Sequence, residues 1–261
     1  MSRQLAGSWS LVLGASSGMG RACALALAGE GSNILGVHLD TAERSGEIAE
    51  LVSQIQGYGV EAHFFNDNAA SERGRARVLD GIGPLAGAGV HVLVHSLAFG
   101  ALAPYLPPGE TLTQRQMDMT LSVMAHSLVY WVQDLVAAKL LPTGARLFAL
   151  TSAGTTRVAR SYGAVAAAKC ALESHVRQLA VELAPAGVSV NAIRAGVTLT
   201  PSFLRIPESA ELSEYARSRN PHGRLTTPGD VAAAIALLAG ATSSWMTGNV
   251  IGVDGGELLT G

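Results

Sequence analysis

The sequence has few charged residues and no long uninterrupted apolar run, and these shortages exclude several classes of protein. Asp, Glu, Lys and Arg make up 15% of the 261 residues and hydrophobic residues 48%, the reverse of the balance in a disordered chain. The formal net charge of −2 offers no electrostatic basis for binding nucleic acid. We therefore expect a folded chain that does not bind nucleic acid.

Membrane, secretory and metal-binding features are also missing. No apolar stretch reaches the roughly 18 residues that a bilayer crossing requires, because Asp134, Lys139 or Glu182 interrupts the longest ones. The first ten residues contain no signal-peptide core. The two cysteines, Cys23 and Cys170, form neither a disulfide framework nor a zinc motif. These features predict a cytoplasmic location, no membrane association and no metal.

Short apolar runs alternate with helical periods along the whole chain, which is typical of a parallel sheet covered on both faces by helices. No linker, charge block or repeat divides the sequence. We therefore predict an α/β fold, with residues 1–261 forming a single doubly wound Rossmann domain around a mostly parallel seven-stranded sheet. Strands are expected at residues 10–14, 33–38, 60–65, 91–95, 146–150, 188–193 and 250–253. Helices are expected at residues 21–30, 41–57, 71–85, 113–140, 162–184, 201–220 and 230–239.

A glycine-rich turn joins the first expected strand to the first helix. Its spacing, G-x-x-x-G-x-G, differs from both G-x-G-x-x-G and the Walker A motif. Such glycines let the backbone approach a pyrophosphate, and the helix N-terminus that follows favours an anion. An ordinary strand–helix turn is the alternative, but the position at the start of the first βαβ unit favours a dinucleotide. The turn thus predicts cofactor contacts at Gly14, Ser16, Ser17, Gly18, Met19 and Gly20.

Four later segments complete a pattern that covers nearly the whole chain. They are Asn68, residues 95–98, residues 191–200, and Thr247–Gly248 with residues 253–256. In this order and spacing they resemble the short-chain dehydrogenases/reductases. The resemblance implies a homotetramer built on the two long helices, with which the low charge content agrees. It also implies further contacts to a nicotinamide cofactor from Asn68, Ala69, His95, Ser96, Leu97, Lys169, Gly196, Val197, Thr198 and Thr200.

Departures from the usual ketoreductase pattern of that family indicate a particular branch. The residue four before Lys169 is Val165, which has no proton to donate, so the available tyrosine is Tyr162 in the spacing Tyr-x6-Lys. Met124 stands where ketoreductases have an Asn. These features resemble the enoyl-(acyl carrier protein) reductases. Ser152 departs from that branch, because many of its members have a second tyrosine at this place.

Tyr162 and Lys169 also stand out on physical grounds. Seven residues at 100° each end about 20° short of two helical turns, so the two side chains share one helix face. Lys169 is one of only two lysines among 18 basic residues, and the fork of an Arg does not replace a compact ammonium. A chance pairing is the alternative. We predict that Tyr162 and Lys169 are catalytic, and that Ser152 either hydrogen-bonds near the substrate carbonyl or caps a turn.

The predicted function is reduction of the 2,3 double bond of a trans-2-enoyl thioester in fatty-acid synthesis. Negative charge collects on the thioester oxygen, where Tyr162 donates a hydrogen bond, and Lys169 binds the nicotinamide ribose. The thioester is carried by acyl carrier protein or by CoA. Alternatives are an enoyl-CoA reductase of secondary metabolism, a 3-oxoacyl or ketone carbonyl reductase, and a non-catalytic dinucleotide sensor. The intact Tyr162 and Lys169 count against the sensor.

The end of the second expected strand bears on the choice of cofactor. His38 and Asp40 lie there, and an Asp accepts hydrogen bonds from the adenosine ribose and disfavours a 2′-phosphate. The sequence therefore favours NADH over NADPH. Two alternatives stay open: Arg44 could turn toward a phosphate, and Asp40 could cap the next helix.

The residues after the nicotinamide turn are expected to cover the substrate. Residues 198–225, of which 201–220 are polar, are predicted to form a mobile lid over the acyl pocket. Predicted substrate contacts are Phe99, Tyr162, Phe203 and Leu204.

Overall fold

Seven parallel strands form one sheet in the order β3-β2-β1-β4-β5-β6-β7. The computed structural model describes residues 3–260, and it confirms the expected Rossmann fold. Strands β2 and β3 are added on one side of β1 and the later strands on its other side, so that β1 pairs with both β2 and β4. The strands are β1 Trp9–Leu13, β2 Asn33–His38, β3 Ala62–Asn66, β4 Val90–His95, β5 Arg146–Ser152, β6 Ser189–Ala195 and β7 Val250–Val253.

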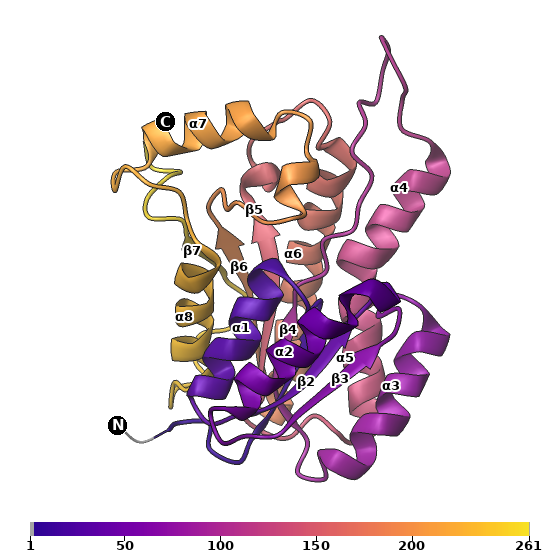
Figure 1. The fold of residues 1–261 in the computed structure, drawn as a ribbon, viewed down its shortest axis with the longest axis vertical. Coiled ribbons are helices and arrows are strands. Elements are labelled where there is room, and N and C mark those ends of the chain that lie inside the picture. Colours follow the sequence, from indigo (N-terminus) through magenta and orange to yellow (C-terminus); the bar gives the residue numbers. More distant parts are fainter. Residues whose placement is uncertain (1–2, 261) are drawn as a thin grey trace.

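The helices cover both faces of the sheet and one of its ends (Figure 1). α1, α2 and α8 lie on one face and α3, α4, α5 and α6 on the other, while α7 crosses above the carboxyl ends of the strands. No helix in the described part of the chain is long and apolar enough to span a bilayer. The helices are α1 Gly18–Gly29, α2 Ser45–Gln56, α3 Glu72–Leu85, α4 Gln114–Leu121, α5 Ser127–Ala137, α6 Gly163–Leu183, α7 Ser209–Arg219 and α8 Pro228–Ala239.

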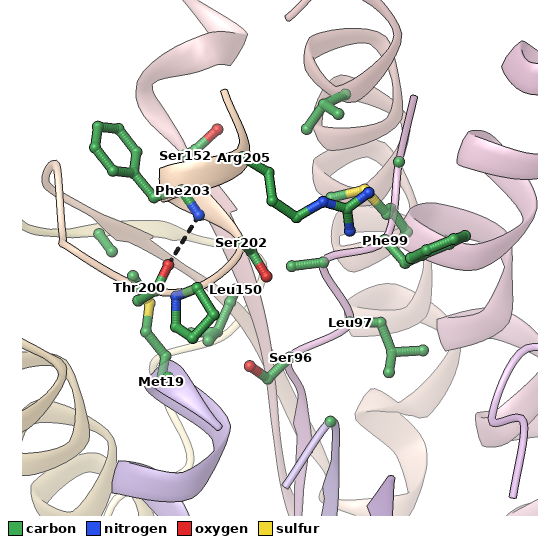
Figure 2. Close-up of a pocket in the computed structure, with 18 of the residues that line it drawn as sticks. Met19, Ser96, Leu97, Phe99, Leu150, Ser152, Thr200, Ser202, Phe203 and Arg205 are labelled. Carbon is green, nitrogen blue, oxygen red and sulfur yellow. Dashed lines mark hydrogen bonds between the residues drawn. The ribbon is translucent and has the colours of Figure 1, made fainter. Parts of the chain in front are cut away.

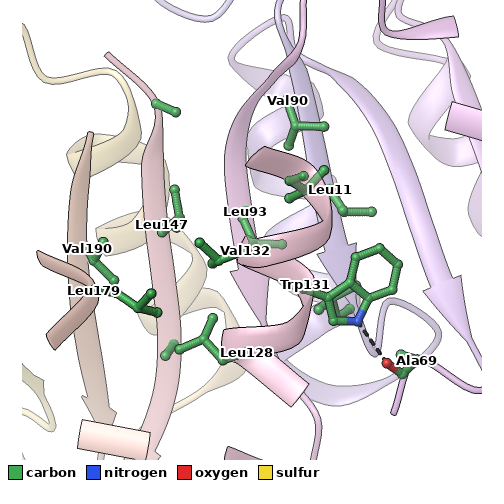
Figure 3. Close-up of a cluster of buried hydrophobic side chains, with 14 of the residues drawn as sticks. Leu11, Ala69, Val90, Leu93, Leu128, Trp131, Val132, Leu147, Leu179 and Val190 are labelled. Carbon is green, nitrogen blue, oxygen red and sulfur yellow. Dashed lines mark hydrogen bonds between the residues drawn. The ribbon is translucent and has the colours of Figure 1, made fainter. Parts of the chain in front are cut away.

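Two apolar clusters hold these layers together. Successive residues of a strand point to opposite faces of the sheet, so Leu11 and Leu13 join one cluster and Val12 joins the other. In the first cluster Trp131 of α5 is fully buried, and its indole nitrogen donates a hydrogen bond to the carbonyl oxygen of Ala69 at 2.8 Å (Figure 3). The continuous apolar strands that identified the sheet are thus buried on both sides.

Two predicted helices differ from the structure. The expected helix 113–140 is divided by a π-helical segment, Ser122–His126, and ends at Ala137. The expected helix 201–220 is reduced to a 3₁₀ turn at Phe203–Arg205 and then α7. Pro207 separates these two pieces, because a proline disfavours helical backbone at the residue before it.

Candidate active site

A cavity of about 990 Å³ lies at the carboxyl ends of the strands, where an α/β sheet binds its ligand. Its lining comes from the glycine-rich turn, the ends of β2, β4, β5 and β6, the start of α6, and the segment that contains α7. Figure 2 shows Ser96 and Leu97 on one side of it and Thr200, Ser202 and Phe203 on the other. Of the predicted site residues, the cavity brings together Gly14, Ser16, Ser17, Gly18, Met19, His38, Asp40, Asn68, Ala69, Ser96, Leu97, Phe99, Ser152, Tyr162, Lys169, Gly196, Val197, Thr198, Thr200 and Phe203.

The glycine-rich turn has the geometry that a dinucleotide phosphate needs. Gly14 has φ +83°, and a Cβ placed on it would lie 2.6 Å from the carbonyl oxygen of Ser96. Gly18 begins α1, and the Ser17 side chain that precedes it caps none of the first N–H groups. The start of α1 therefore presents backbone donors and a partial positive charge to the cavity, which fits the pyrophosphate of a nicotinamide cofactor.

The position of Gly20 differs from the predicted cofactor contact. It does not line the cavity but packs against the carbonyl group of Gly14, so closely that a Cβ would overlap that oxygen. Gly20 therefore allows the close packing of α1 behind the turn, which any side chain at this position would disrupt.

Tyr162 and Ser152 lie together in the cavity wall. Tyr162 immediately precedes α6, and its hydroxyl lies 3.3 Å from that of Ser152 at the end of β5. The phenol ring lies over Gly154, where a Cβ would be 2.6 Å from Cε1 of Tyr162. Burial raises the pKa of Tyr162 and the hydrogen bond with Ser152 lowers it by less. The phenol therefore keeps its proton at neutral pH and can donate a hydrogen bond.

Lys169 lies on α6, two turns beyond Tyr162, and is almost completely buried. Its Nζ donates a hydrogen bond of 2.6 Å to the carbonyl oxygen of Leu150. Burial lowers the pKa of Lys169 to about 8, although the negative charge of Glu173 acts in the opposite direction. The ammonium thus lines the cavity as a positive charge near neutral pH.

His95 and Leu204 do not contact the cavity, contrary to the prediction. His95 is fully buried under its floor, with Nε2 2.8 Å from the hydroxyl of Ser127. Burial and the charge of Lys169 lower the pKa of His95 to about 3, so it is neutral in the folded protein. Leu204 points outward with 61% of its surface exposed, because it lies on the outer side of a 3₁₀ turn.

Asp40 is the centre of a network of side chains beside the cavity. Its carboxylate accepts hydrogen bonds from His38 Nδ1 at 2.8 Å and from Arg44, whose guanidinium also binds Glu47. Burial would raise the pKa of Asp40, but hydrogen bonds from Ser16 and His38 and the charge of Arg44 outweigh it and lower the pKa. Asp40 is therefore ionised at neutral pH.

This network bears on the two alternatives left by the sequence, a capping role for Asp40 and an approach of Arg44 to a phosphate. Thr41, and not Asp40, precedes the 3₁₀ turn Ala42–Arg44, so Asp40 does not cap it. Arg44 lines the cavity but is held by two carboxylates.

An apolar wall occupies the position from which a Tyr-x-x-x-Lys phenol would act. Val165 and Met124 both line the cavity and pack around Gly100, where a Cβ would lie 2.8 Å from Val165 Cγ2 and 2.9 Å from Met124 Sδ. Met124 is on the π-helical segment. The two departures noted in the sequence are therefore neighbours in space.

Arg157 and Glu257 form a part of the site that the sequence did not reveal. Arg157 lies 3.5 Å from the Glu257 carboxylate, and its guanidinium stacks on the Tyr215 ring of α7. The other carboxylate oxygen of Glu257 accepts a hydrogen bond from the backbone N–H of Val197 at 2.9 Å. Glu257 thus connects the nicotinamide turn to Arg157. The 100 residues that separate Arg157 from Glu257 left no local signal for this contact.

Comparison with known proteins agrees with this geometry. The family model described as enoyl-(acyl carrier protein) reductase matches residues 14–257. An NADPH-dependent aldehyde reductase-like chloroplastic protein of Arabidopsis thaliana is 30% identical, over 97% of this chain and 94% of its own. The 1-cyclohexenylcarbonyl-CoA reductase of Streptomyces collinus is also 30% identical, over 95% and 85%. A short-chain dehydrogenase from Burkholderia cenocepacia J2315, solved in complex with NADP, aligns with a TM-score of 0.85 and 26% identity over 98% and 99%.

The chain therefore belongs to the short-chain dehydrogenase/reductase superfamily, within the group that the enoyl-(acyl carrier protein) reductase model describes. Its class is that of the NAD(P)-dependent oxidoreductases. Within residues 3–260, no three His, Cys, Asp or Glu side chains are grouped closely enough to hold a metal ion.

Proposed function

We propose that the protein reduces the carbon–carbon double bond of a 2-enoyl thioester. One observation carries the proposal: the phenol of Tyr162 lines the same cavity as an apolar wall of Val165 and Met124, which occupy the places of two polar groups of a ketoreductase. The family model and the relative that acts on a cyclohexenylcarbonyl-CoA support the same reaction.

The residues of the site would divide the chemistry as follows. A nicotinamide cofactor bound along the glycine-rich turn would supply the hydride for Cβ of the substrate, and a proton from Tyr162 or from water would complete the reduction at Cα. Tyr162 donates a hydrogen bond to the thioester oxygen, where the negative charge develops. Its raised pKa keeps the proton available. Lys169 would hold the nicotinamide ribose, and Ser152 would fix the direction of the Tyr162 hydroxyl.

Cofactor choice follows from the end of β2. The ionised Asp40 faces the cavity and would accept hydrogen bonds from the adenosine ribose hydroxyls, while its charge opposes a 2′-phosphate. We therefore propose that NADH is the preferred reductant. Arg44 also lines the cavity, and we expect it to permit a lesser use of NADPH.

The thioester and the assembly are part of the same proposal. We propose that the acyl group is presented on acyl carrier protein or CoA and enters under the segment 198–225, from which Phe203, Ile206 and Leu212 line the cavity. A homotetramer would cover apolar side chains that are exposed on the long helices, including Val136 and Val181.

Oxidation of NADH and NADPH at 340 nm tests this function. Crotonyl-CoA or a longer trans-2-enoyl thioester is compared with acetoacetyl-CoA, using the wild type and Tyr162→Phe. We expect oxidation with the enoyl substrate alone, faster with NADH, and strongly reduced in the variant. Oxidation with acetoacetyl-CoA alone would instead identify a carbonyl reductase.

A further inference from the structure

The burial of Lys169 disfavours the charged form of its side chain, which the proposed site needs for binding the cofactor. The side chain is 6% exposed and has one hydrogen-bond acceptor, the carbonyl oxygen of Leu150. A buried ammonium loses its hydration, so burial favours the neutral amine. An amine without charge would bind ribose hydroxyls more weakly, because hydrogen bonds from an ionised donor are about twice as strong. A nearby group of opposite charge is therefore needed to stabilise the Lys169 ammonium.

Glu173 supplies an opposite charge one helical turn away. It follows Lys169 by four residues on α6, and side chains at that spacing are neighbours on one helix face. Its Oε1 accepts a hydrogen bond of 2.7 Å from the hydroxyl of Thr151. Thr151 is buried and follows Leu150 on β5, so the acceptor of Lys169 and the donor to Glu173 are consecutive residues. The carboxylate is therefore fixed against the same strand end as the ammonium.

We propose that Glu173 is a positioning residue that keeps the Lys169 ammonium charged at the floor of the cavity, with Thr151 holding the carboxylate in place. This inference rests on the proposed role of Lys169 in cofactor binding. Glu173 itself does not line the cavity, so it acts through Lys169 and not on the ligand.

The other titratable groups around Lys169 do not supply this charge. His95 of β4 is neutral, because burial and the Lys169 charge lower its pKa to about 3. Tyr162, at the start of the same helix, keeps its proton because burial raises its pKa. In the described part of the chain, Glu173 is the group whose charge raises the pKa of Lys169. Its removal is therefore expected to convert more of Lys169 to the neutral amine near pH 7.5.

The test is the pH dependence of cofactor binding, measured by the fluorescence of bound NADH or NADPH, whichever the wild type binds more tightly. For Glu173→Gln we expect affinity to begin to fall about one pH unit lower than in the wild type. The dissociation constant would then be about threefold weaker at pH 7.5 and nearly unchanged at pH 6. Glu173→Asp retains the charge and should keep the wild-type profile. Thr151→Val should move the profile in the same direction by less.

Glu182→Gln is the matched control, since it removes the same charge from an exposed position of α6. It should leave the profile unchanged. An equal loss of affinity at every pH in Glu173→Gln, or an unmoved profile, would overturn the proposal and indicate a structural role. Because the readout is cofactor binding, a failure to reduce any enoyl thioester would refute the proposed function without affecting this result.

Discussion

The hydroxyl oxygens of Tyr162 and Ser152 lie 3.3 Å apart, although Ser152 ends a strand and Tyr162 immediately precedes a helix. The contact brings these two hydroxyl groups together in the wall of the cavity, which Val165 and Met124 also line. Since Ser152 also accepts a hydrogen bond from the backbone N–H of Gly154 at 3.3 Å, its orientation is set by the turn that follows β5. Tyr162 thus meets a partner that is itself fixed.

Replacing Tyr162 by Phe removes the hydrogen-bond donor and retains the ring. We expect kcat to fall by about 10²–10³, the usual effect of losing one donor to a developing oxyanion. Cofactor affinity should change little. Ser152→Ala should lower kcat by less, because the phenol remains. Steady-state kinetics with an enoyl thioester measures both effects, and equal losses in the two variants would contradict the assigned roles.

A methyl group on Gly154 should disturb the site without touching its polar groups. The new Cβ would lie 2.6 Å from Cε1 of Tyr162, so the ring has to move. Displacement of a catalytic group by about 1 Å costs on the order of 10² in rate, and we expect Gly154→Ala to lose at least tenfold in kcat. Gly46→Ala is the control, because no atom lies within 4 Å of its added Cβ. Full activity in both variants would show that the ring position is not critical.

Removal of the Asp40 charge should change the choice of cofactor. In Asp40→Ser the repulsion of a 2′-phosphate is lost and Arg44 is released from one of its carboxylates. We expect the ratio of kcat/KM for NADPH to that for NADH to rise about tenfold, which corresponds to about 1.4 kcal/mol. The exposed neighbour Glu43 provides a control as Glu43→Ser. An unchanged ratio would show that Asp40 does not discriminate.

We expect the buried ammonium of Lys169 to lower the free energy of unfolding of the protein. Its pKa of about 8 lies below the ordinary 10.5, so below pH 8 the folded protein bears the full penalty of a buried charge. Lys169→Met should therefore be inactive but more stable by roughly 1–3 kcal/mol at pH 7. As the pH rises from 8 to 10.5 the wild type loses this penalty, and the difference should shrink. Denaturant unfolding at pH 7 and pH 10 measures the stability difference between the variant and the wild type and its decrease with pH. A Lys169→Met variant that is less stable than the wild type at pH 7 would refute the argument.

The sheet and part of the cavity lining, including the glycine-rich turn, Tyr162 and Lys169, could be predicted because they follow from local pattern. Apolar runs identify buried strands, and a glycine-rich turn after the first strand identifies the cofactor end of the sheet. The spacing of Tyr162 and Lys169 predicted that both would lie on one helix face, and both line the cavity, although Tyr162 immediately precedes α6. Such features need only the residues nearby in the sequence.

The failures concern packing between distant segments. His95 occupies a motif position, yet its ring turns under the floor because Ser127 of α5 offers a partner there. Leu204 follows the right turn but lies on its outer side. Two contacts join different elements of the fold, and no periodicity in the sequence predicts them. They are the contact of Arg157 with Glu257 and that of Thr151 with Glu173.

The hydrogen bond between Trp131 and Ala69 has a practical consequence. Ala69 lines the cavity while Trp131 is fully buried in the core, so the indole is attached to the wall of the predicted adenine site. Of the other tryptophans, Trp245 is 94% exposed and Trp9 lies in the core at β1. The emission of Trp131 is therefore a built-in optical reporter of events at the nucleotide, readable in the unlabelled protein once Trp245 and Trp9 have each been replaced by a non-fluorescent residue.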